Sequence, residues 1–479
     1  MELGMRILAV ATTLVVALLT GASLALAADI GANDDSAKFA DDGGAALFAQ
    51  MSSLGLKQTV IGVRFVPSDP MTIQDKPQLD RAIASASSAG LRVVLAVYPY
   101  PPRELEAGLG SPGMFASYVG VLASIYPEVK EFVIGNEPNQ PAFWRPQFDP
   151  SGENASAAAF GPYLAAAYDT LKAVNPDIEV VGVGLSPRGN DRPNAKNNIS
   201  TSPVRFLRAL GDWYRRSGRT RPLMDGFSFH PYPNKATDPL ARGYAWPNIG
   251  FANLDRLKQA LWDAFEGTPQ PTTLNGLRLH LDEVGWQVDT TGRAGYHGVE
   301  NVPVTDEATQ ASIYAELVHE ADCDPDIASV SFFGFHDDGL RTGFQAGLFR
   351  ADGSPRAAAA AVEAAIADAS ASGCAAQVQW QPGVVVSGAR VAVGAKGSIV
   401  TARVEAGEDV RARVCVRPVD APKKRASRCR AASISGFHPA SVALVIPKTD
   451  VRVRVAIDLT AAANRARRLH VVREAVLRG

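Results

Sequence analysis

The chain has 479 residues, more than one ordinary domain needs and enough for a barrel of about 250 residues plus a second module. Its hydrophobic content of 46% is near the globular average, which argues against wholesale disorder. The net charge of −1 hides an asymmetry, because residues 28–374 hold 28 Lys and Arg against 41 Asp and Glu, whereas residues 375–479 hold 19 against 7. We therefore expect two chemically different parts.

The first 27 residues have the pattern of a bacterial-type secretory signal peptide. Arg6 precedes an apolar run from Ile7 to Leu19, and Ala25-Leu26-Ala27 supplies a small-x-small cleavage site. The alternative is an uncleaved membrane anchor, but the run is short for a membrane span. We therefore expect a secreted, extracellular protein with a signal peptide over residues 1–27.

The four cysteines fall in two pairs that are local in the sequence, and export would permit disulfides. Of the three possible connectivities we favour Cys323 with Cys374 and Cys415 with Cys429. The chain has no C-x-x-C motif, and its seven histidines are scattered without ligand spacing. We therefore expect no metal site and no cofactor.

Residues 28–374 alternate short apolar runs with helical stretches, which is typical of a parallel α/β fold. Several of the runs are almost continuously apolar, as expected of strands that are covered on both faces. Eight strands are predicted, over Asp29–Ala32, Thr59–Val66, Leu91–Val97, Phe132–Gly135, Glu179–Val183, Gly226–His230, Arg278–Glu283 and Ser329–Phe335. Eight helices alternate with them, over Ala45–Leu54, Gln78–Ala89, Gly113–Tyr126, Ala157–Val174, Pro203–Arg216, Leu254–Phe265, Asp306–Ala321 and Pro355–Ala371, the last with Ser354 as its N-cap. This count predicts a (β/α)₈ barrel in preference to a doubly wound open sheet.

Residues 375–479 have a different texture. Apolar and charged residues alternate in Val451–Ile457 and in parts of Val384–Val393, Ser398–Val404 and Val410–Val416, and clusters of Gly, Pro and basic residues separate these runs. This alternation predicts a small antiparallel β-sandwich.

Two carboxylates follow predicted strands at the barrel mouth, where the C-terminal ends of the strands converge. Glu137 follows the fourth strand in Asn136-Glu137-Pro138, and Glu283 ends the seventh in Asp282-Glu283-Val284. A buried carboxylate is costly without a partner or a task. Glycosidic cleavage needs two of them, one to protonate the leaving oxygen and one to attack or stabilise the anomeric centre.

These motifs resemble the signatures of glycoside hydrolase clan A, most closely families 5 and 39. The resemblance covers the whole barrel and implies that Glu137 is the acid/base and Glu283 the nucleophile of a retaining double displacement. It implies further that Arg64 holds the nucleophile, that Asn136 binds the sugar 2-hydroxyl, and that His230-Pro-Tyr232 orders the site. The chain departs from family 5 in two places, with Tyr98-Pro-Tyr100 where a histidine is usual after the third strand, and Phe335-His336-Asp337-Asp338 where a tryptophan is usual after the eighth.

Aromatic residues in the segments after the strands are candidate platforms for sugar rings. Trp144 and Trp286 stand closest in sequence to the two glutamates. Asp282 is expected to point away from the site, because neighbouring strand residues face opposite sides. We also expect Arg64 to keep the pKa of Glu283 low, and the repulsion between the two glutamates to raise the pKa of the acid.

The sequence thus predicts a secreted retaining glycoside hydrolase acting on O-glycosidic bonds of an oligosaccharide or polysaccharide. The alternatives are a transglycosylase with the same site and a non-catalytic carbohydrate-binding barrel. The basic excess of residues 375–479 could dock that module on the acidic barrel or bind an anionic cell-wall polymer. Nucleic acid is a poor partner, because this module lacks RNA-binding aromatic motifs.

Overall fold

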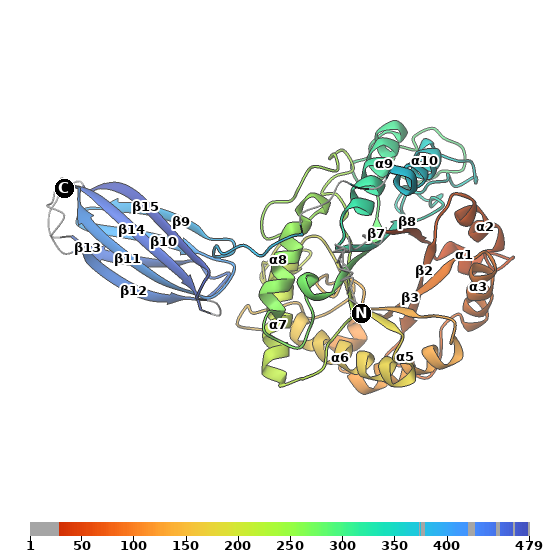
Figure 1. The fold of residues 1–479 in the computed structure, drawn as a ribbon, viewed down its shortest axis with the longest axis horizontal. Coiled ribbons are helices and arrows are strands. Elements are labelled where there is room, and N and C mark those ends of the chain that lie inside the picture. Colours follow the sequence, from red (N-terminus) through yellow and green to blue (C-terminus); the bar gives the residue numbers. More distant parts are fainter. Residues whose placement is uncertain are drawn as a thin grey trace, which may run out of the picture.

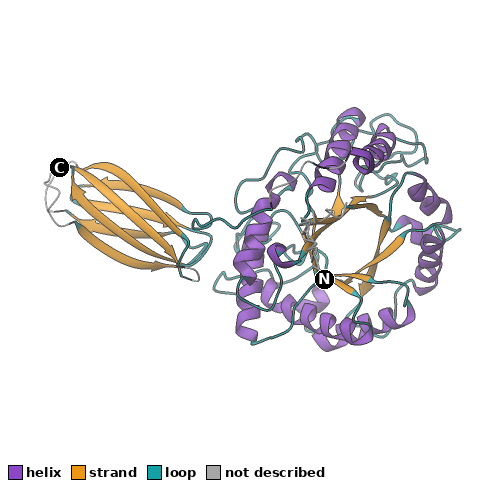
Figure 2. Ribbon diagram, viewed as in Figure 1, coloured by secondary structure: helices purple, strands orange, loops and turns teal. Residues whose placement is uncertain are grey.

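The computed structural model describes residues 28–372, 374, 379–419, 427–446, 451–462 and 465–477. The predicted signal peptide, residues 1–27, lies outside them. The described chain forms a closed barrel of eight parallel strands with helices around it, and a separate β module beside it (Figures 1 and 2). The barrel strands follow chain order, and β1 closes the ring by pairing with β8. The predicted fold class is confirmed.

The elements of the barrel region alternate along the chain as predicted. Its strands are β1 (Asp29–Asn33), β2 (Gln58–Phe65), β3 (Arg92–Pro99), β4 (Glu131–Ile134), β5 (Glu179–Leu185), β6 (Gly226–Phe229), β7 (Arg278–Val284) and β8 (Ile327–Phe333). Its helices are α1 (Ser36–Phe39), α2 (Ala45–Ser53), α3 (Lys76–Ser88), α4 (Pro102–Glu106), α5 (Pro112–Ile125), α6 (Ser156–Val174), α7 (Pro203–Ser217), α8 (Leu254–Phe265), α9 (Glu307–Cys323) and α10 (Ala357–Ser372), with short 3₁₀ turns η1 (Phe251–Asn253) and η2 (Thr273–Asn275).

One predicted helix start is wrong. The last helix begins at Ala357, so Ser354 is not its N-cap. Ser354 instead donates both its backbone N–H and its hydroxyl to the carboxylate of Asp352, at 2.9 and 2.6 Å. This local Asx turn competes with helix formation and delays the first helical turn.

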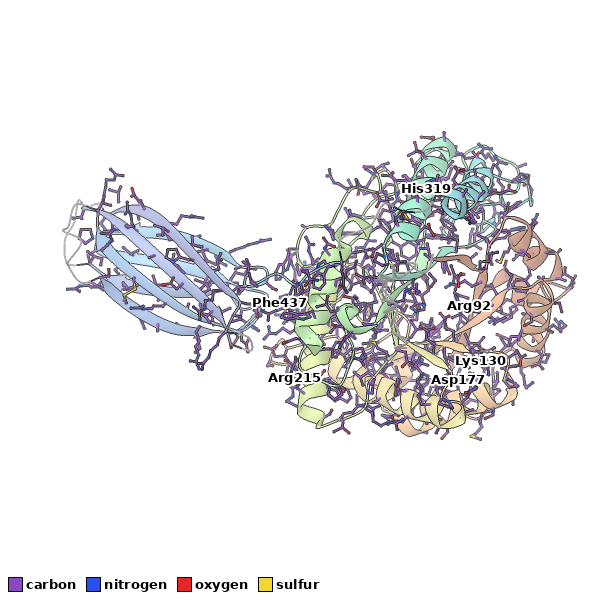
Figure 3. The ribbon with its side chains drawn as sticks, in the orientation of Figure 1. Arg92, Lys130, Asp177, Arg215, His319 and Phe437 are labelled. Atoms are coloured by element: carbon purple, nitrogen blue, oxygen red, sulfur yellow. A yellow bond between two sulfur atoms is a disulfide. The ribbon has the colours of Figure 1, made fainter. Side chains whose placement is uncertain are left out.

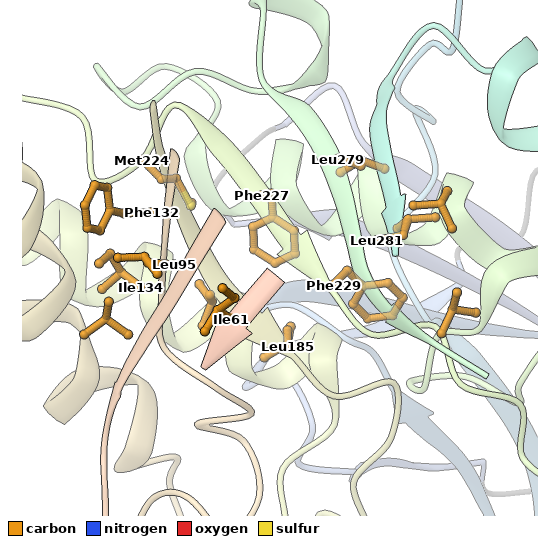
Figure 4. Packing of buried hydrophobic residues seen from close by; sticks show 14 of the residues in the cluster. Ile61, Leu95, Phe132, Ile134, Leu185, Met224, Phe227, Phe229, Leu279 and Leu281 are labelled. Atoms are coloured by element: carbon orange, nitrogen blue, oxygen red, sulfur yellow. The ribbon is translucent and has the colours of Figure 1, made fainter. Parts of the chain in front are cut away.

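The main core lies between the barrel and its helices, because one face of each strand packs outward against them. Ile61, Leu95 and Phe132 belong to this cluster (Figure 4). The opposite faces of the same strands point into the barrel, where Val60, Val94, Val133 and Val181 form a small cluster of their own. The barrel is therefore a filled scaffold that holds the C-terminal strand ends in fixed positions.

A buried polar cluster fills the opposite, N-terminal end of the barrel. His280 on β7 lies 3.0 Å from Glu131 and 3.2 Å from Glu179, and Arg92 pairs with Glu131 at 3.1 Å. Burial alone would lower the pKa of His280, but the two carboxylates outweigh it and raise that pKa to about 9. Glu131 therefore has structural partners at the end of the barrel opposite the mouth.

The C-terminal module consists of two antiparallel sheets around their own core. One contains β9 (Arg390–Lys396), β10 (Ile399–Glu405) and β13 (Ala440–Val445), and the other β11 (Val410–Pro418), β12 (Arg428–Ile434), β14 (Val451–Ala461) and β15 (Arg468–Leu477). Of the range Val384–Val393, parts of which were expected to alternate, the strand β9 includes only the residues from Arg390 onward. Both favoured disulfides are present, Cys323–Cys374 and Cys415–Cys429.

The module contacts the barrel through an aromatic stack and an ion-pair cluster. The ring of Phe437, which Figure 3 shows at the junction, stacks on Trp246 at 5.4 Å and 15°. Arg467 of the module is buried, and it pairs with Asp263 of α8 and with Glu408 of its own module. Ser387 also donates its hydroxyl to Asp263 at 2.8 Å. The module is therefore docked on the face formed by α7 and α8. Of the two expectations for its basic excess, this contact agrees with docking on the acidic barrel.

In the part of the chain that the structure describes, no helix is long and apolar enough to cross a membrane.

Candidate active site

Glu137 stands in a tight bend at the mouth of β4. Gly135 has a φ of 110°, and a Cβ there would come within 2.6 Å of the Val183 carbonyl oxygen, so this position requires glycine. Glu137 itself has a φ of 40°, which is rare for a residue with a side chain. Its backbone N–H donates to the carbonyl of Gly184 at 2.6 Å, and its carbonyl accepts from Gln140 at 2.8 Å. Neighbouring backbone thus holds Glu137 in a strained conformation, which is typical of functional residues.

Glu283 lies near the end of β7, and its side chain turns toward the same mouth. Its Oε2 accepts a hydrogen bond from the hydroxyl of Tyr232 at 3.0 Å. Only 16% of the Glu283 side chain and 18% of the Glu137 side chain are exposed, so both carboxyl groups can be covered by a bound ligand.

His230, directly after β6, brings the two glutamates together. Its Nδ1 lies 3.3 Å from Oε1 of Glu137 and 3.4 Å from Oε2 of Glu283. The sum of these distances, about 6.7 Å, is the largest possible separation of the two oxygens, and a retaining pair needs about 5–5.5 Å between carboxyl groups. The structure thus places both predicted catalytic residues, His230 and Tyr232 in one cluster.

Asp282 belongs to this cluster, so the prediction that it points away is wrong. Its Oδ1 lies 3.5 Å from Nε2 of His230 and accepts a hydrogen bond from Ser228 at 2.5 Å. β7 changes register against β8 between Leu281 and Val284, so strict alternation does not decide where its side chains reach. Asp282 holds one edge of the imidazole while the glutamates contact the other.

The charges in this cluster are strongly coupled. Burial raises the pKa of Glu283 to about 7, aided by the negative charges of Glu137 and Asp282 and opposed by His230 and by the Tyr232 hydrogen bond. Burial would lower the pKa of His230, but the surrounding carboxylates outweigh it and raise the pKa to about 10. The expectation of a low pKa for Glu283 is therefore wrong, because burial dominates. The carboxylates therefore favour the protonated form of His230.

Arg64 does not hold Glu283. Both residues are described, and no ion pair within 4.0 Å joins Arg64 to Glu283, whose carboxylate contacts His230 instead. The Nε of Arg64 lies 3.5 Å from the hydroxyl of Tyr98, and its guanidinium lies 5.1 Å from the ring centre of Tyr100. Tyr98 and Tyr100 thus hold the arginine on their side of the mouth. Asn136, directly before Glu137, is half-buried, and its contact with a sugar stays a prediction.

Trp144 and Trp286 cannot serve as sugar platforms in this structure. Trp144 is 4% exposed, and its ring packs edge-on against Phe160 and Tyr163. Trp286 is 2% exposed, and its indole N–H donates to the carbonyl of Asp238 at 2.8 Å. Both tryptophans anchor loops to the barrel. Their closeness to the glutamates in sequence therefore did not predict that their rings face a ligand.

Other aromatic residues surround the mouth instead. Phe333, at the end of β8, and Phe344 both contact the ring of Tyr232, at 6.2 and 5.5 Å between ring centres. Neither residue was singled out from the sequence. Phe333 lies two residues before Phe335, where the segment considered after the eighth strand begins, and Phe344 lies in a loop far beyond that strand. On the other side, Tyr98, Tyr100 and Phe143 form an edge-on cluster.

A cavity of about 370 Å³ reaches the two-glutamate cluster at Glu137 and Tyr232, although Glu283 does not line it. Its walls include Glu137, Tyr232 and Phe344, together with the polar residues Gln140, Arg188, Asn234, Lys235 and Gln287. Its volume is in the usual range for small-molecule sites. A partly apolar wall with several polar groups suits a ligand that has both hydroxyl groups and apolar ring faces.

The fold and site define a (β/α)₈-barrel protein with a coupled pair of glutamates at its mouth. No family model and no curated protein matches the chain. Among solved structures it is similar to a family 39 glycoside hydrolase from Bacteroides cellulosilyticus WH2, with 15% identity over 87% of this chain and 80% of that one and a TM-score of 0.49. It is also similar to GH5_18 from Streptomyces cattleya in complex with GlcNAc, with 15% identity over 73% of this chain and 82% of that one and a TM-score of 0.49. A third similar structure is the exo-beta-1,4-mannosidase Op5Man5 from Opitutaceae bacterium strain TAV5, with 15% identity over 72% of this chain and 60% of that one and a TM-score of 0.47. At such identities and TM-scores, the function of this chain has to be inferred from its site.

Proposed function

We propose that the chain is a retaining glycoside hydrolase that cleaves O-glycosidic, β-configured bonds. The observation that carries this proposal is the contact of one imidazole nitrogen of His230 with Glu137 and Glu283 together, which limits the separation of the two carboxyl groups. An upper limit of about 6.7 Å between these oxygens allows the separation of about 5–5.5 Å that double displacement requires and leaves out nearly all of the wider separations found in inverting enzymes.

The first step forms a glycosyl-enzyme ester. Oε2 or Oε1 of Glu283 attacks the anomeric carbon while Glu137 gives its proton to the departing glycosidic oxygen, so the C–O bond of the substrate breaks as the ester bond forms. In the second step Glu137 takes a proton from water, the water oxygen attacks the same carbon, and Glu283 leaves as a carboxylate. A sugar acceptor in place of water would give transglycosylation from the same intermediate.

The ionisation of the site suits this cycle. The reactive form has a proton on Glu137 and a charged Glu283, so the pair must hold one proton in total. Protonated His230 beside both groups and the Tyr232 hydroxyl on Glu283 favour the negative charge on the nucleophile. With a pKa of about 7, Glu283 ionises near neutral pH, and the charged form is the one that can act as the nucleophile.

The direct test is the stereochemistry of the first-formed product. Proton NMR of the reaction on an aryl β-glycoside should show the β-anomer first, with the α-anomer appearing only by mutarotation. An α-anomer formed first would mean inversion and would overturn the proposed mechanism. Sugar binding without turnover of any glycoside would favour the non-catalytic barrel.

We further propose that the protein is secreted. The predicted signal peptide supports this, and so do the two disulfides, because disulfides persist in oxidising compartments. Fractionation of cells expressing the full chain would test it, since retention of the unprocessed protein inside the cell would contradict secretion.

A basic sheet face supports binding of an anionic polysaccharide by the C-terminal module. Val410, Ala412, Val414 and Val416 point into the module core, so Arg411, Arg413 and Arg417 on the same strand point outward. Arg417 lies directly opposite Arg454 of β14, and Arg454 pairs with Glu474 of β15 at 3.2 Å. Guanidinium groups bind carboxylate or sulfate oxygens with two parallel hydrogen bonds. The basic run Lys423-Lys424-Arg425 also belongs to the basic excess of this module, and it lies outside the described residues.

Affinity electrophoresis in polygalacturonate tests this part of the proposal. The double variant Arg411→Ala/Arg413→Ala should lose most of its retardation, and the retardation of the unchanged protein should fall as salt is added. The double variant Arg390→Ala/Arg403→Ala is the matched control, because these two arginines lie on the other sheet. Equal retardation of both variants, or stronger retention by single-stranded DNA than by polygalacturonate, would contradict it.

A further inference from the structure

A second cavity lies next to the cavity that Glu137 lines. It has a volume of about 760 Å³ and is bounded by the loops after β4 and β5 and by Phe437 and His438 of the C-terminal module. The exposed residue Asn198 lines both cavities, and Pro141 of the larger one directly follows Gln140 of the smaller. The two hollows are therefore neighbours along one side of the barrel mouth.

The module wall of this cavity is held in place from several directions. Phe437 stacks on Trp246, and the guanidinium groups of Arg205 and Arg208 lie 5.6 and 5.7 Å from its ring centre. The backbone N–H of Gly436 donates to Asp409 at 2.9 Å, and Arg208 pairs with the same carboxylate at 2.5 Å. His438 reaches Glu153 of the barrel at 3.5 Å. A wall this well fixed can form part of a binding site.

The barrel wall presents free polar groups. Asn194, Lys196 and Asn198 alternate along one segment, are exposed, and line the cavity. Within the described residues no hydrogen bond or ion pair uses their side-chain amide or ammonium groups. Four prolines, Pro141, Pro146, Pro150 and Pro193, give the same cavity flat apolar surfaces. Hydrogen-bonding groups next to flat apolar surface suit the hydroxyl edges and C–H faces of sugar rings.

We propose that this cavity is a distal carbohydrate-binding site that the C-terminal module completes, so that the substrate is an oligosaccharide or polysaccharide chain long enough to occupy both cavities. This rests on the glycosidase activity proposed above. A chain held at both places is positioned for cleavage by binding energy far from the reacting bond. The charges of the lining are mixed, with Arg145, Lys196 and Arg205 against Glu106, Asp149 and Asp191, which favours a neutral chain here over the anionic polymer proposed for the basic sheet face.

The test compares long and short substrates in the full chain. The probes are the p-nitrophenyl β-glycosides of glucose, mannose and xylose, and the corresponding β-1,4-linked hexaoses. In the double variant Asn194→Ala/Lys196→Ala, and in His438→Ala, the ratio of kcat/KM on the hexaose to kcat/KM on the aryl glycoside should fall about tenfold, as expected for the loss of one or two hydrogen bonds. Arg192→Ala is the matched control, because Arg192 is an exposed basic residue of the same segment that does not line the cavity.

The outcomes separate the two proposals. If the unchanged protein cleaves the hexaose and the variants keep its ratio of activities, the distal site is refuted while the glycosidase stands. An equal loss on both kinds of substrate would also refute it, because it would show a general effect on the fold. If the unchanged protein cleaves no glycoside, the proposed function fails and the distal site fails with it.

Discussion

The hydroxyl of Tyr232 donates a hydrogen bond to Oε2 of Glu283 at 3.0 Å. This bond favours the ionised form of a carboxyl group whose pKa burial has already raised to about 7. It also fixes the direction in which the attacking oxygen points. Tyr232 therefore both orients the proposed nucleophile and limits the rise of its pKa.

Replacing Tyr232 by Phe should move the acidic limb of the kcat/KM profile to higher pH. The variant loses the hydrogen bond that lowers the pKa of Glu283, so more alkaline solution is needed to ionise the nucleophile, and a shift of about half a unit to one unit is expected. Arg64→Met is the comparison, because Arg64 contacts Tyr98 and not Glu283. A limb that moves with Arg64→Met and stays in place with Tyr232→Phe would reverse the roles assigned to these residues.

Azide should restore activity to the two glutamate variants with opposite stereochemistry. Glu283→Ala removes the nucleophile and should lower kcat at least ~10³-fold, and azide attacking directly should give an inverted glycosyl azide. Glu137→Ala should slow cleavage by about 10²–10⁴-fold on substrates with poor leaving groups, and azide should then give a retained product. NMR of the azide products decides the assignment, and the same stereochemistry from both variants would contradict it.

His280 should stabilise the protein in acid and neutral solution more than in alkali. Its pKa in the folded protein, about 9, is above the unfolded value of about 6.5, so its contribution is complete below about pH 6.5 and is lost as the pH rises through 9. Urea unfolding should therefore show that His280→Gln costs about 2 kcal/mol more at pH 6 than at pH 10. An equal cost at the two pH values would mean that His280 acts by packing alone.

The barrel could be predicted from sequence because its strands are covered on both faces, so that several of them are almost continuously apolar runs that alternate with helical stretches. Each predicted strand overlaps an observed one, and Glu137 and Glu283 follow from their positions at strand ends. The C-terminal module was harder, because β12 and β15 carry exposed arginines and show only weak alternation of buried and exposed residues. Alternation also failed locally at Asp282, where the register of β7 shifts.

Side-chain burial in loops was not predictable in the same way. Trp144 and Trp286 stand beside the glutamates in sequence, but the chain turns their rings into the core. Phe344 reaches Tyr232 from a loop whose course depends on its tertiary contacts. The pKa of Glu283 likewise depends on burial and on three neighbours that the sequence does not place beside it.

Trp246→Ala should weaken the docking of the C-terminal module. The variant loses the stack with Phe437 and leaves space between the two parts, which should cost about 2–4 kcal/mol of the free energy of unfolding. Calorimetry should show a lower Tm and a broader or split transition as the module and the barrel uncouple.

Deletion of residues 375–479 should lower the Tm of the barrel further, because it exposes Trp246 and leaves Asp263 without Arg467. A truncated barrel with an unchanged Tm would mean that the docking contributes nothing to stability.

Glu137→Gly should be more stable than Glu137→Ala, although neither variant can supply the proposed acid. The backbone of Glu137 has a φ of 40°, where a Cβ is unfavourable and glycine is not. Glycine should therefore relieve about 1 kcal/mol of strain that alanine retains, beyond the entropy that glycine gains in the unfolded chain. Urea unfolding of the two variants at pH 7 measures the difference, and both lack the carboxylate, so loss of charge cancels in the comparison. Serine substituted at the same position should behave like alanine. If alanine and glycine give equal stability, the left-handed backbone at Glu137 stores no strain, and its conformation serves only to aim the carboxyl group.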